Sequence, residues 1–382
     1  MMKRTGAAVL CAALLALTAC SSSSSGGDGG SGKLHLGGIF ALTGTGSIFG
    51  TAQKKGAELA VSEINAARGV KGRKINFTVL DEASVKDRAV SAMQKLVSDS
   101  SVLAVMGPTF SANGQAAAPI ANAAKVPDLG VSWAAPAGTT DVGPYVWRDN
   151  ITDGQAIPAA AKAAKSKLNF TTAGLLYGND DAFTKAGGDT FKQVAKDSGV
   201  KLVDTETFAQ TDQDFSSQLT KLKSSNPDVL FVSATGAATA TILIQARRLG
   251  LKVPVVGGNG FNTPTVPQNA KSAANGVIVA AAWDSSSAAT NPTNKKFIDA
   301  FTAKYGSAPD QFAAQAYTGM KIIAYALENG GTSRDGVIKG FKKVQSTSLD
   351  TPLGKFSFSP SRDAQQKPVV LTIKNGKYSV LG

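Results

Sequence analysis

Residues 34–67 read LHLGGIFALTGTGSIFGTAQKKGAELAVSEINAA, and this stretch decides the fold class. Its first nine residues form a short apolar run that predicts a buried strand. A glycine-rich turn follows, and then a segment in which Ala57, Val61 and Ile64 recur at helical spacing. Because a strand, a turn and a helix in this order begin a βαβ unit, the stretch predicts an α/β fold built on a parallel sheet.

The same alternation of apolar runs and helical patterns continues along the chain. Further strands are predicted at residues 75–79, 102–106, 172–177, 200–203, 229–233, 253–256 and 277–281. The strands fall into two successive blocks of similar size, which predicts two similar doubly wound lobes. Near the end, Asn375-Gly376 between β-rich flanks predicts a two-residue hairpin.

Length and composition fit this organisation. The chain has 382 residues, enough for two domains with full cores, and 43 % hydrophobic against 18 % charged residues is typical of soluble globular proteins. The net charge is +13, but the lysines are scattered and have no interleaved aromatic residues. We therefore expect no nucleic-acid partner, and interpret the charge as favouring solubility and attraction to an anionic envelope.

The N-terminus predicts export and lipidation. Lys3 and Arg4 precede an apolar run at 7–17, which is too short to span a bilayer and is typical of a signal peptide at residues 1–19. The following Leu-Thr-Ala-Cys resembles a bacterial lipobox, which would make Cys20 the acylated residue and anchor the protein outside the cytoplasm on the cell membrane. Cys11 lies inside the signal, so the mature chain keeps no disulfide.

A polar linker separates that cysteine from the first strand. Residues 21–32 read SSSSSGGDGGSG, and a random coil of this length spans roughly 17 to 21 Å. We interpret residues 20–33 as the lipidated cysteine and a flexible tether that holds a folded domain off a membrane.

Motifs for catalysis, cofactors and metals are missing from the sequence. It has no G-x-S-x-G, H-E-x-x-H or P-loop, and His35 is its only histidine. The glycines at 44–50 are one residue too widely spaced for a dinucleotide fingerprint, and Asp81 lies 37 positions after Gly44 rather than about 20. We predict no enzyme activity and no cofactor or metal.

The residues suited to binding a ligand lie instead in the loops after the predicted strands. They are rich in Gly, Ser, Thr and Asn, and in an open α/β sheet ligands bind beyond the carboxyl ends of the strands. Ser111 would stand at a helix N-terminus, where free N–H groups and the helix dipole favour a carboxylate. The alternative is that Ser111 only caps that helix.

Motifs in order along the chain resemble those of type I periplasmic-type solute-binding proteins of the branched-chain amino acid ABC importer family. The matching pieces are Gly44 with Phe49-Gly50, GAELAV at 56–61, Gly69-Val70-Lys71-Gly72, Asp81-Glu82, Met106-Gly107, Ser111 with Gln115, Arg148, Gln245-Ala246-Arg247 with Leu249-Gly250, and Thr351-Pro352-Leu353-Gly354. Together they span residue 34 to the C-terminus. Each piece is weak alone, but their order and spacing are specific.

The resemblance implies two lobes joined by three hinge strands that close on a small ligand. It places one lobe at 34–152 plus 282–348 and the other at 153–281 plus 349–382. It also implies an ABC permease as partner of a monomeric binding subunit. The ligand-binding residues it implies are Phe49, Ser111, Ser132, Trp133, Ala134, Phe183, Thr235 and Asn259.

Two of these positions depart from the family pattern. Thr235 stands where amino-acid binders carry a Tyr, and Asn259 where they carry the Glu that pairs with the ligand ammonium. Because a buried ammonium without a carboxylate is costly, we expect 2-keto acids, aromatic acids or amides to bind at least as well as leucine. Asp153, Asp180 or Asp181 is the alternative source of the missing charge.

Two rival functions remain open from the sequence. A ligand sensor for a signalling partner would use the same closure, and an envelope hydrolase would need a nucleophile motif that the sequence lacks. The ligand itself is not identified by these residues.

Overall fold

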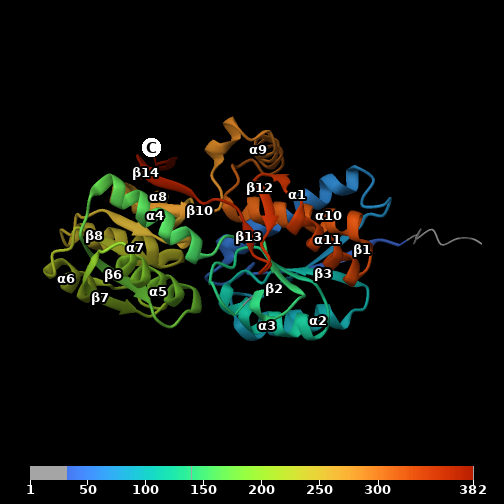
Figure 1. Cartoon of the computed structure of the whole chain (residues 1–382), viewed down its shortest axis with the longest axis horizontal. Coiled ribbons are helices and arrows are strands. Elements are labelled where there is room, and N and C mark those ends of the chain that lie inside the picture. The colour runs from blue at the N-terminus through green and yellow to red at the C-terminus, as the bar shows by residue number, and fades with distance from the viewer. Residues whose placement is uncertain (1–31, 139, 382) are drawn as a thin grey trace, which may run out of the picture. The chain divides into compact units, whose positions relative to one another are not determined.

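The computed structural model describes residues 32–138 and 140–381, and within them two sheets, one parallel and one mainly parallel, form the centres of two lobes (Figure 1). The first sheet has the order β2-β1-β3-β4-β5. Its strands are β1 (Leu34–Phe40), β2 (Ile75–Asp81), β3 (Val102–Met106), β4 (Asp128–Gly130) and β5 (Val146–Arg148), all parallel. From β1 the chain adds β2 on one side and the later strands on the other, so the winding direction reverses between β1 and β3. Such a reversal opens a crevice at the carboxyl ends of these two strands.

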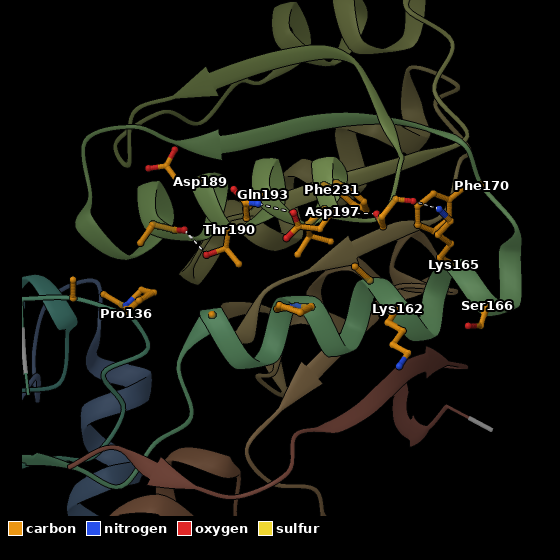
Figure 2. A pocket seen from close by; sticks show the side chains of 18 of the residues that line it. Pro136, Lys162, Lys165, Ser166, Phe170, Asp189, Thr190, Gln193, Asp197 and Phe231 are labelled. Carbon is orange, nitrogen blue, oxygen red and sulfur yellow. Dashed lines mark hydrogen bonds between the residues drawn. The ribbon is translucent and has the colours of Figure 1, made fainter. Parts of the chain in front are cut away.

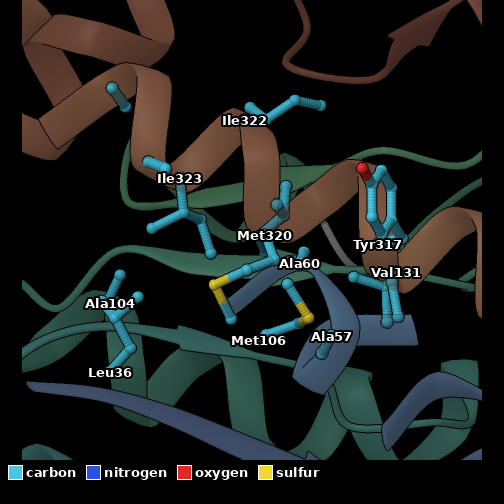
Figure 3. Packing of buried hydrophobic residues seen from close by; sticks show 14 of the residues in the cluster. Leu36, Ala57, Ala60, Ala104, Met106, Val131, Tyr317, Met320, Ile322 and Ile323 are labelled. Carbon is cyan, nitrogen blue, oxygen red and sulfur yellow. The ribbon is translucent and has the colours of Figure 1, made fainter. Parts of the chain in front are cut away.

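Helices cover both faces of the first sheet. One face carries α1 (Ser47–Ala66), α9 (Pro292–Tyr305), α10 (Gln311–Gly330) and α11 (Arg334–Ser346), and the other carries α2 (Lys86–Ser98) and α3 (Ser111–Ala123). Figure 3 shows how Met320 and Ile323 of α10 pack against Leu36, Ala104 and Met106 of the sheet. Phe297 and Phe301 of α9 are buried in the same core.

The second sheet has the order β15-β14-β10-β9-β8-β6-β7. The parallel strands are β6 (Thr172–Gly178), β7 (Lys201–Phe208), β8 (Val229–Ser233), β9 (Val255–Gly257) and β10 (Ile278–Ala281). β14 (Val369–Lys374) runs antiparallel to β10, and β15 (Lys377–Val380) pairs with β14. The predicted hairpin is confirmed, because Asn375 and Gly376 both have positive φ values, of 50° and 74°, as a type I′ turn requires.

The helices of the second lobe also lie on two faces. α4 (Asp153–Leu168) and α5 (Ala182–Asp197) pack on one face, and α6 (Ser216–Ser224), α7 (Gly236–Arg248) and α8 (Thr265–Ala270) on the other. Short 3₁₀ segments are η1 (Thr140–Val142), η2 (Asn259–Phe261), η3 (Lys271–Ala274) and η4 (Ser285–Ala289). Among the described residues, none of the helices combines the length and apolarity needed to cross a bilayer.

A small third sheet lies beside the first lobe. It consists of β11 (Leu349–Thr351), β12 (Gly354–Phe358) and β13 (Ala364–Gln365). Phe358 packs against Trp147 and Phe341, with ring centroids 4.9 and 5.5 Å apart. This differs from the expected boundary, which assigned the whole of 349–382 to the second lobe. The aromatic contacts keep the segment with the first core, and the chain joins the second sheet only at β14.

Candidate ligand-binding cleft

A cavity of about 510 Å³ lies at the carboxyl ends of strands from both sheets. The first lobe contributes residues after β1, β2, β3 and β4 and the start of α10, and the second lobe contributes residues after β6, β7, β8 and β9. Of the eight predicted ligand-binding residues, seven line this cavity: Phe49, Ser111, Ser132, Ala134, Phe183, Thr235 and Asn259. The parallel strands explain the convergence, because their carboxyl ends meet at one edge of each sheet.

Ser111 holds together two loops of the first-lobe wall. Its Oγ accepts hydrogen bonds from the backbone N–H groups of Ala134 and Ala135, at 3.1 and 3.2 Å. It does not cap α3, whose N-cap residue is Phe110 and lacks a side-chain cap bond. The hydroxyl proton of Ser111 and the first-turn N–H groups of α3 are therefore donors for an anionic ligand atom.

Ser132 and Ala134 line the cleft, but their polar groups are engaged. The Ser132 hydroxyl donates to the Thr109 carbonyl at 2.9 Å and accepts from Gln53 Nε2 at 2.5 Å. The N–H of Ala134 is the donor to Ser111. Both residues therefore shape the wall rather than supply free donors.

Trp133 lies outside the cleft. Its side chain is fully buried in the first lobe, and Nε1 donates to the Pro108 carbonyl at 2.7 Å. The ring covers Gly114 and Gly130, where a Cβ atom would stand only 2.3 Å from it. Burying a large apolar ring in this core stabilises the fold more than exposing it in a hydrated cleft. No signal in the sequence distinguishes Trp133 from its neighbours in the same loop.

A buried carboxyl group lies behind the first-lobe wall. Glu82 accepts hydrogen bonds from the Thr109 N–H and from Asn113 Nδ2, at 3.1 and 3.0 Å. Burial raises the pKa of Glu82 to about 7, although these hydrogen bonds act in the opposite direction. Thr109 and Asn113 line the cleft and were missed by the sequence analysis, although they flank Ser111 in the loop that it singled out.

Asn259 and Thr235 stand on the second-lobe wall. The Thr235 hydroxyl donates to Gln210 Oε1 at 3.3 Å. Asn259 is only 3 % exposed, and its Oδ1 has no hydrogen-bond partner among the described residues. An acceptor that is buried without a donor is costly, so this oxygen suits a ligand N–H group.

Carboxylates gather on the same wall. Asp180, Asp181 and Asp212 line the cleft, and the described lining residues include no Lys, Arg or His. Asp181 caps α5 by accepting from the N–H groups of Phe183 and Thr184 through Oδ1, both at 3.0 Å. Burial raises the pKa of Asp181, and the nearby Asp180 adds to that shift. The second-lobe wall thus presents negative charge in a chain whose net charge is positive.

Asp153, the third carboxylate considered as a source of the missing negative charge, does not line the cavity. It is fully buried behind Asn259, whose N–H donates to Asp153 Oδ1 at 3.2 Å. Burial raises the pKa of Asp153 to about 7. Of the three candidates, only Asp180 and Asp181 can meet a ligand in this arrangement.

Aromatic rings form the apolar part of the cleft. Phe49, Phe110 and Phe312 come from the first lobe, and Phe183 faces them from α5. The Phe49 ring lies 4.7 Å from that of Phe312 and 6.0 Å from that of Phe110. This group can bury an apolar portion of a ligand between the polar walls.

A second cavity, of about 1090 Å³, lies mainly between α4 and α5. Figure 2 shows Lys162, Lys165 and Phe170 along it, with Gln193 and Asp197 opposite. Its polar groups largely bond to each other, since Lys165 donates to the Ser198 carbonyl and Gln193 donates to Asp197 at 2.7 Å. None of the predicted ligand-binding residues lines it. The smaller cleft is therefore the candidate site.

Comparison with known proteins agrees with the fold. A sequence model of the family described as periplasmic binding protein matches residues 33–377. The chain is 28 % identical to the Leu/Ile/Val-binding protein BraC3 of Rhizobium johnstonii, covering 86 % of this chain and 88 % of that protein. It is 25 % identical to a leucine-, isoleucine-, valine-, threonine- and alanine-binding protein of Pseudomonas aeruginosa, over 84 % of each chain.

Solved structures give the same result. The branched-chain amino acid transporter substrate-binding protein LivJ of Streptococcus pneumoniae, in complex with isoleucine, superimposes with a TM-score of 0.83 at 29 % identity, covering 91 % of this chain and 99 % of that one. A solute-binding protein of R. palustris in complex with benzoate shares the fold, with a TM-score of 0.82 at 24 % identity over 92 % and 96 % of the two chains. These proteins are transporter binding subunits and not enzymes. The chain belongs to the periplasmic binding protein family and, within it, to the type I solute-binding proteins related to branched-chain amino acid transport.

Proposed function

We propose that this chain is the extracytoplasmic binding subunit of an ABC importer and captures an α-amino acid by closure of two lobes. The observation that carries the proposal is the opposite polarity of the two cleft walls. Ser111 and the N-terminus of α3 offer donors on one wall, while Asp180 and Asp181 offer negative charge on the other. A zwitterion with an apolar side chain satisfies both walls, and the phenylalanine rings can receive its side chain.

This ligand class differs from the one that Asn259 alone suggested. A 2-keto or aromatic acid would bring a second negative charge beside Asp180, Asp181 and Asp212, with no Lys, Arg or His among the described lining residues to offset it. An ammonium would bond to the unpartnered Asn259 Oδ1 and to Asp181, whose cap bonds from the N–H groups of Phe183 and Thr184 go to Oδ1. We therefore place the charge of the family glutamate on Asp181.

The proposed lobes are 34–152 with 282–365, and 153–281 with 366–381. The first division follows the packing of α9, α10 and α11 on the first sheet and of β12 beside it. The chain passes between the proposed lobes after β5, after β10 and after β13. Three connections of this kind permit a hinge motion that opens and closes the cleft.

We also propose that Cys20 carries the lipid anchor of a monomeric subunit that delivers its ligand to a membrane permease. Cys20 lies outside the described residues, and the support for this step is the signal-like segment, the four residues ending in the cysteine, and the polar linker after it. Replacing Cys20 by Ser should release the protein from the membrane fraction. Incorporation of radiolabelled fatty acid into the Cys20→Ser variant would contradict the anchor.

Titration of an amino acid against its 2-keto analogue tests the ligand class. A thermal-shift screen of amino acids first identifies a ligand, since binding at 100 times Kd stabilises the fold by about 2.7 kcal/mol. Calorimetry then compares that amino acid with its 2-keto analogue, and we expect the keto acid to bind at least about tenfold more weakly, because it leaves the acidic wall unpaired. Equal affinities, or a screen in which no amino acid binds, would contradict the proposal.

Two aspartate variants test whether Asp181 supplies the negative charge that pairs with the ligand ammonium. Asp181→Asn keeps the helix cap, because Asn is as good an N-cap as Asp, but removes the charge. It should lower amino-acid affinity about tenfold or more and leave keto-acid affinity unchanged or higher. Asp189→Asn, on the same helix and paired with Lys192 outside the cleft, is the matched control and should change neither affinity.

A further inference from the structure

The turn between α1 and β2 is strongly basic. Residues 67–74 read ARGVKGRK and contain four cationic side chains and no acidic one. Val70 and Arg73 close the turn with two backbone hydrogen bonds of 2.9 Å each. The side chains of Arg68, Lys71 and Lys74 are exposed at its surface.

Hydrogen bonds join this turn to the start of the described chain and to the end of α10. Arg73 donates through Nε to the Gly32 carbonyl at 2.7 Å and through Nη2 to the Lys33 carbonyl at 3.4 Å. The Lys71 N–H donates to Glu328 at 2.9 Å, and Lys343 Nζ donates to the neighbouring Asn329 carbonyl at 2.6 Å. These contacts define one surface, the tether-end patch. It is made of six cationic residues and one exposed carboxylate: Lys33, Arg68, Lys71, Arg73, Lys74, Lys343 and Glu328.

The tether-end patch lies at the opposite edge of the first sheet from the ligand cleft. Lys33 precedes β1 and residues 67–74 precede β2, whereas Phe49 and Ser84 in the cleft follow these two strands. β1 and β2 are parallel and seven residues long, so the two edges are separated by about 20 Å. A large partner at the patch therefore leaves the cleft open to ligand.

We propose that the tether-end patch docks the first lobe on the anionic surface of the membrane, with the cleft directed away from the lipid. The proposal rests on the proposed anchor at Cys20, which lies twelve residues before Gly32. Twelve residues reach at most about 40 Å even when fully extended, so the anchor keeps the patch within that distance of the lipid. Clustered Lys and Arg side chains bind anionic headgroups once within a Debye length of about 8 Å. The anchor holds the protein near the membrane, and the patch determines which surface of the first lobe faces the lipid.

Vesicle binding by the full-length Cys20→Ser chain tests the patch without the lipid. We expect it to cosediment with phosphatidylcholine vesicles that contain phosphatidylglycerol and not with pure phosphatidylcholine, and added salt should abolish binding. The variant Arg68→Asn, Lys71→Asn, Lys74→Gln should weaken that binding about tenfold or more. Asn is chosen at positions 68 and 71 because both have positive φ values, of 74° and 49°, which Asn tolerates.

A matched variant tests whether vesicle binding depends on the position of the removed charges or only on their number. Lys196→Gln, Lys201→Gln, Lys252→Gln removes the same charge from exposed positions of the second lobe and should retain binding. Equal loss in both variants, or no preference for phosphatidylglycerol in the parent, would overturn the docking proposal. Thermal melting and ligand titration of each variant confirm that it is folded. Fatty-acid labelling of the unmodified chain reports on Cys20 independently, so the anchor and the patch can fail separately.

Discussion

Ser111 joins two loops of the first-lobe wall through one oxygen atom. Because its Oγ accepts from the N–H groups of Ala134 and Ala135, its proton remains for a ligand. Ser111 therefore joins two loops instead of capping α3, and under the proposed function its hydroxyl also donates to the ligand.

Ser111→Ala should weaken ligand binding and destabilise the fold together. Loss of the hydroxyl removes a donor to the ligand, at a cost of about 1 to 3 kcal/mol, or roughly five- to 150-fold in Kd. It also leaves two N–H groups unpaired in a buried loop, so the melting temperature should fall. Ser91→Ala, an exposed serine on α2, is the control for calorimetry and melting. Unchanged affinity in Ser111→Ala would restrict this residue to its structural role.

At the scale of elements, α1 and α10 pack with their backbones in contact. A Cβ atom at Gly56 would stand 2.1 Å from the carbonyl oxygen of Ala313. The neighbouring Ala57 and Ala60 are small and buried, and Figure 3 shows them beside α10. Since Phe49 lies in the first turn of α1 and Phe312 in the first turn of α10, this packing sets the distance between two rings of the cleft.

Gly56→Ala should destabilise the protein even though alanine favours helices. The added methyl group must push the two helices apart, and overpacking of this kind costs about 1 to 3 kcal/mol. Urea denaturation should show a lower midpoint, and ligand affinity should fall as Phe49 and Phe312 separate. Ser62→Ala, at an exposed position of the same helix, should leave both unchanged. An unaltered midpoint in Gly56→Ala would show that the helices can separate without cost.

For the whole molecule, buried carboxyl groups make stability depend on pH. Burial raises the pKa values of Glu82 and Asp153 to about 7, whereas in the unfolded chain both are near 4. Between these values the folded state holds protons that the unfolded state releases. The free energy of unfolding contributed by these groups therefore falls as the pH rises from about 4 to about 7.

Asp153→Asn should reduce this dependence. The amide cannot ionise, so the difference in unfolding free energy between mildly acidic and neutral pH should shrink by an amount on the order of a few kcal/mol. Urea denaturation across that range measures the difference, and Asp189→Asn serves as the exposed control. A variant with the same pH profile as the parent would show that Asp153 ionises normally in the folded protein.

The sequence by itself determined the two α/β blocks, the hairpin at Asn375-Gly376 and the position of the cleft beyond the strand ends. These follow from periodicity and local turn chemistry, which act over a few residues. The ends of elements are less well specified: Ala57, Val61 and Ile64 mark the first helix, but that helix begins at Ser47, inside the glycine-rich turn.

Only the tertiary structure decided which loops face each other. It placed Trp133 in the core, kept β12 with the first lobe, and brought Asp181 and Asp212 to one wall with Asn259. The bonds that build the cleft join residues far apart in the chain, such as Ser132 with Gln53 and Asn259 with Asp153. Such contacts depend on how whole sheets and helices pack, and no local pattern specifies them.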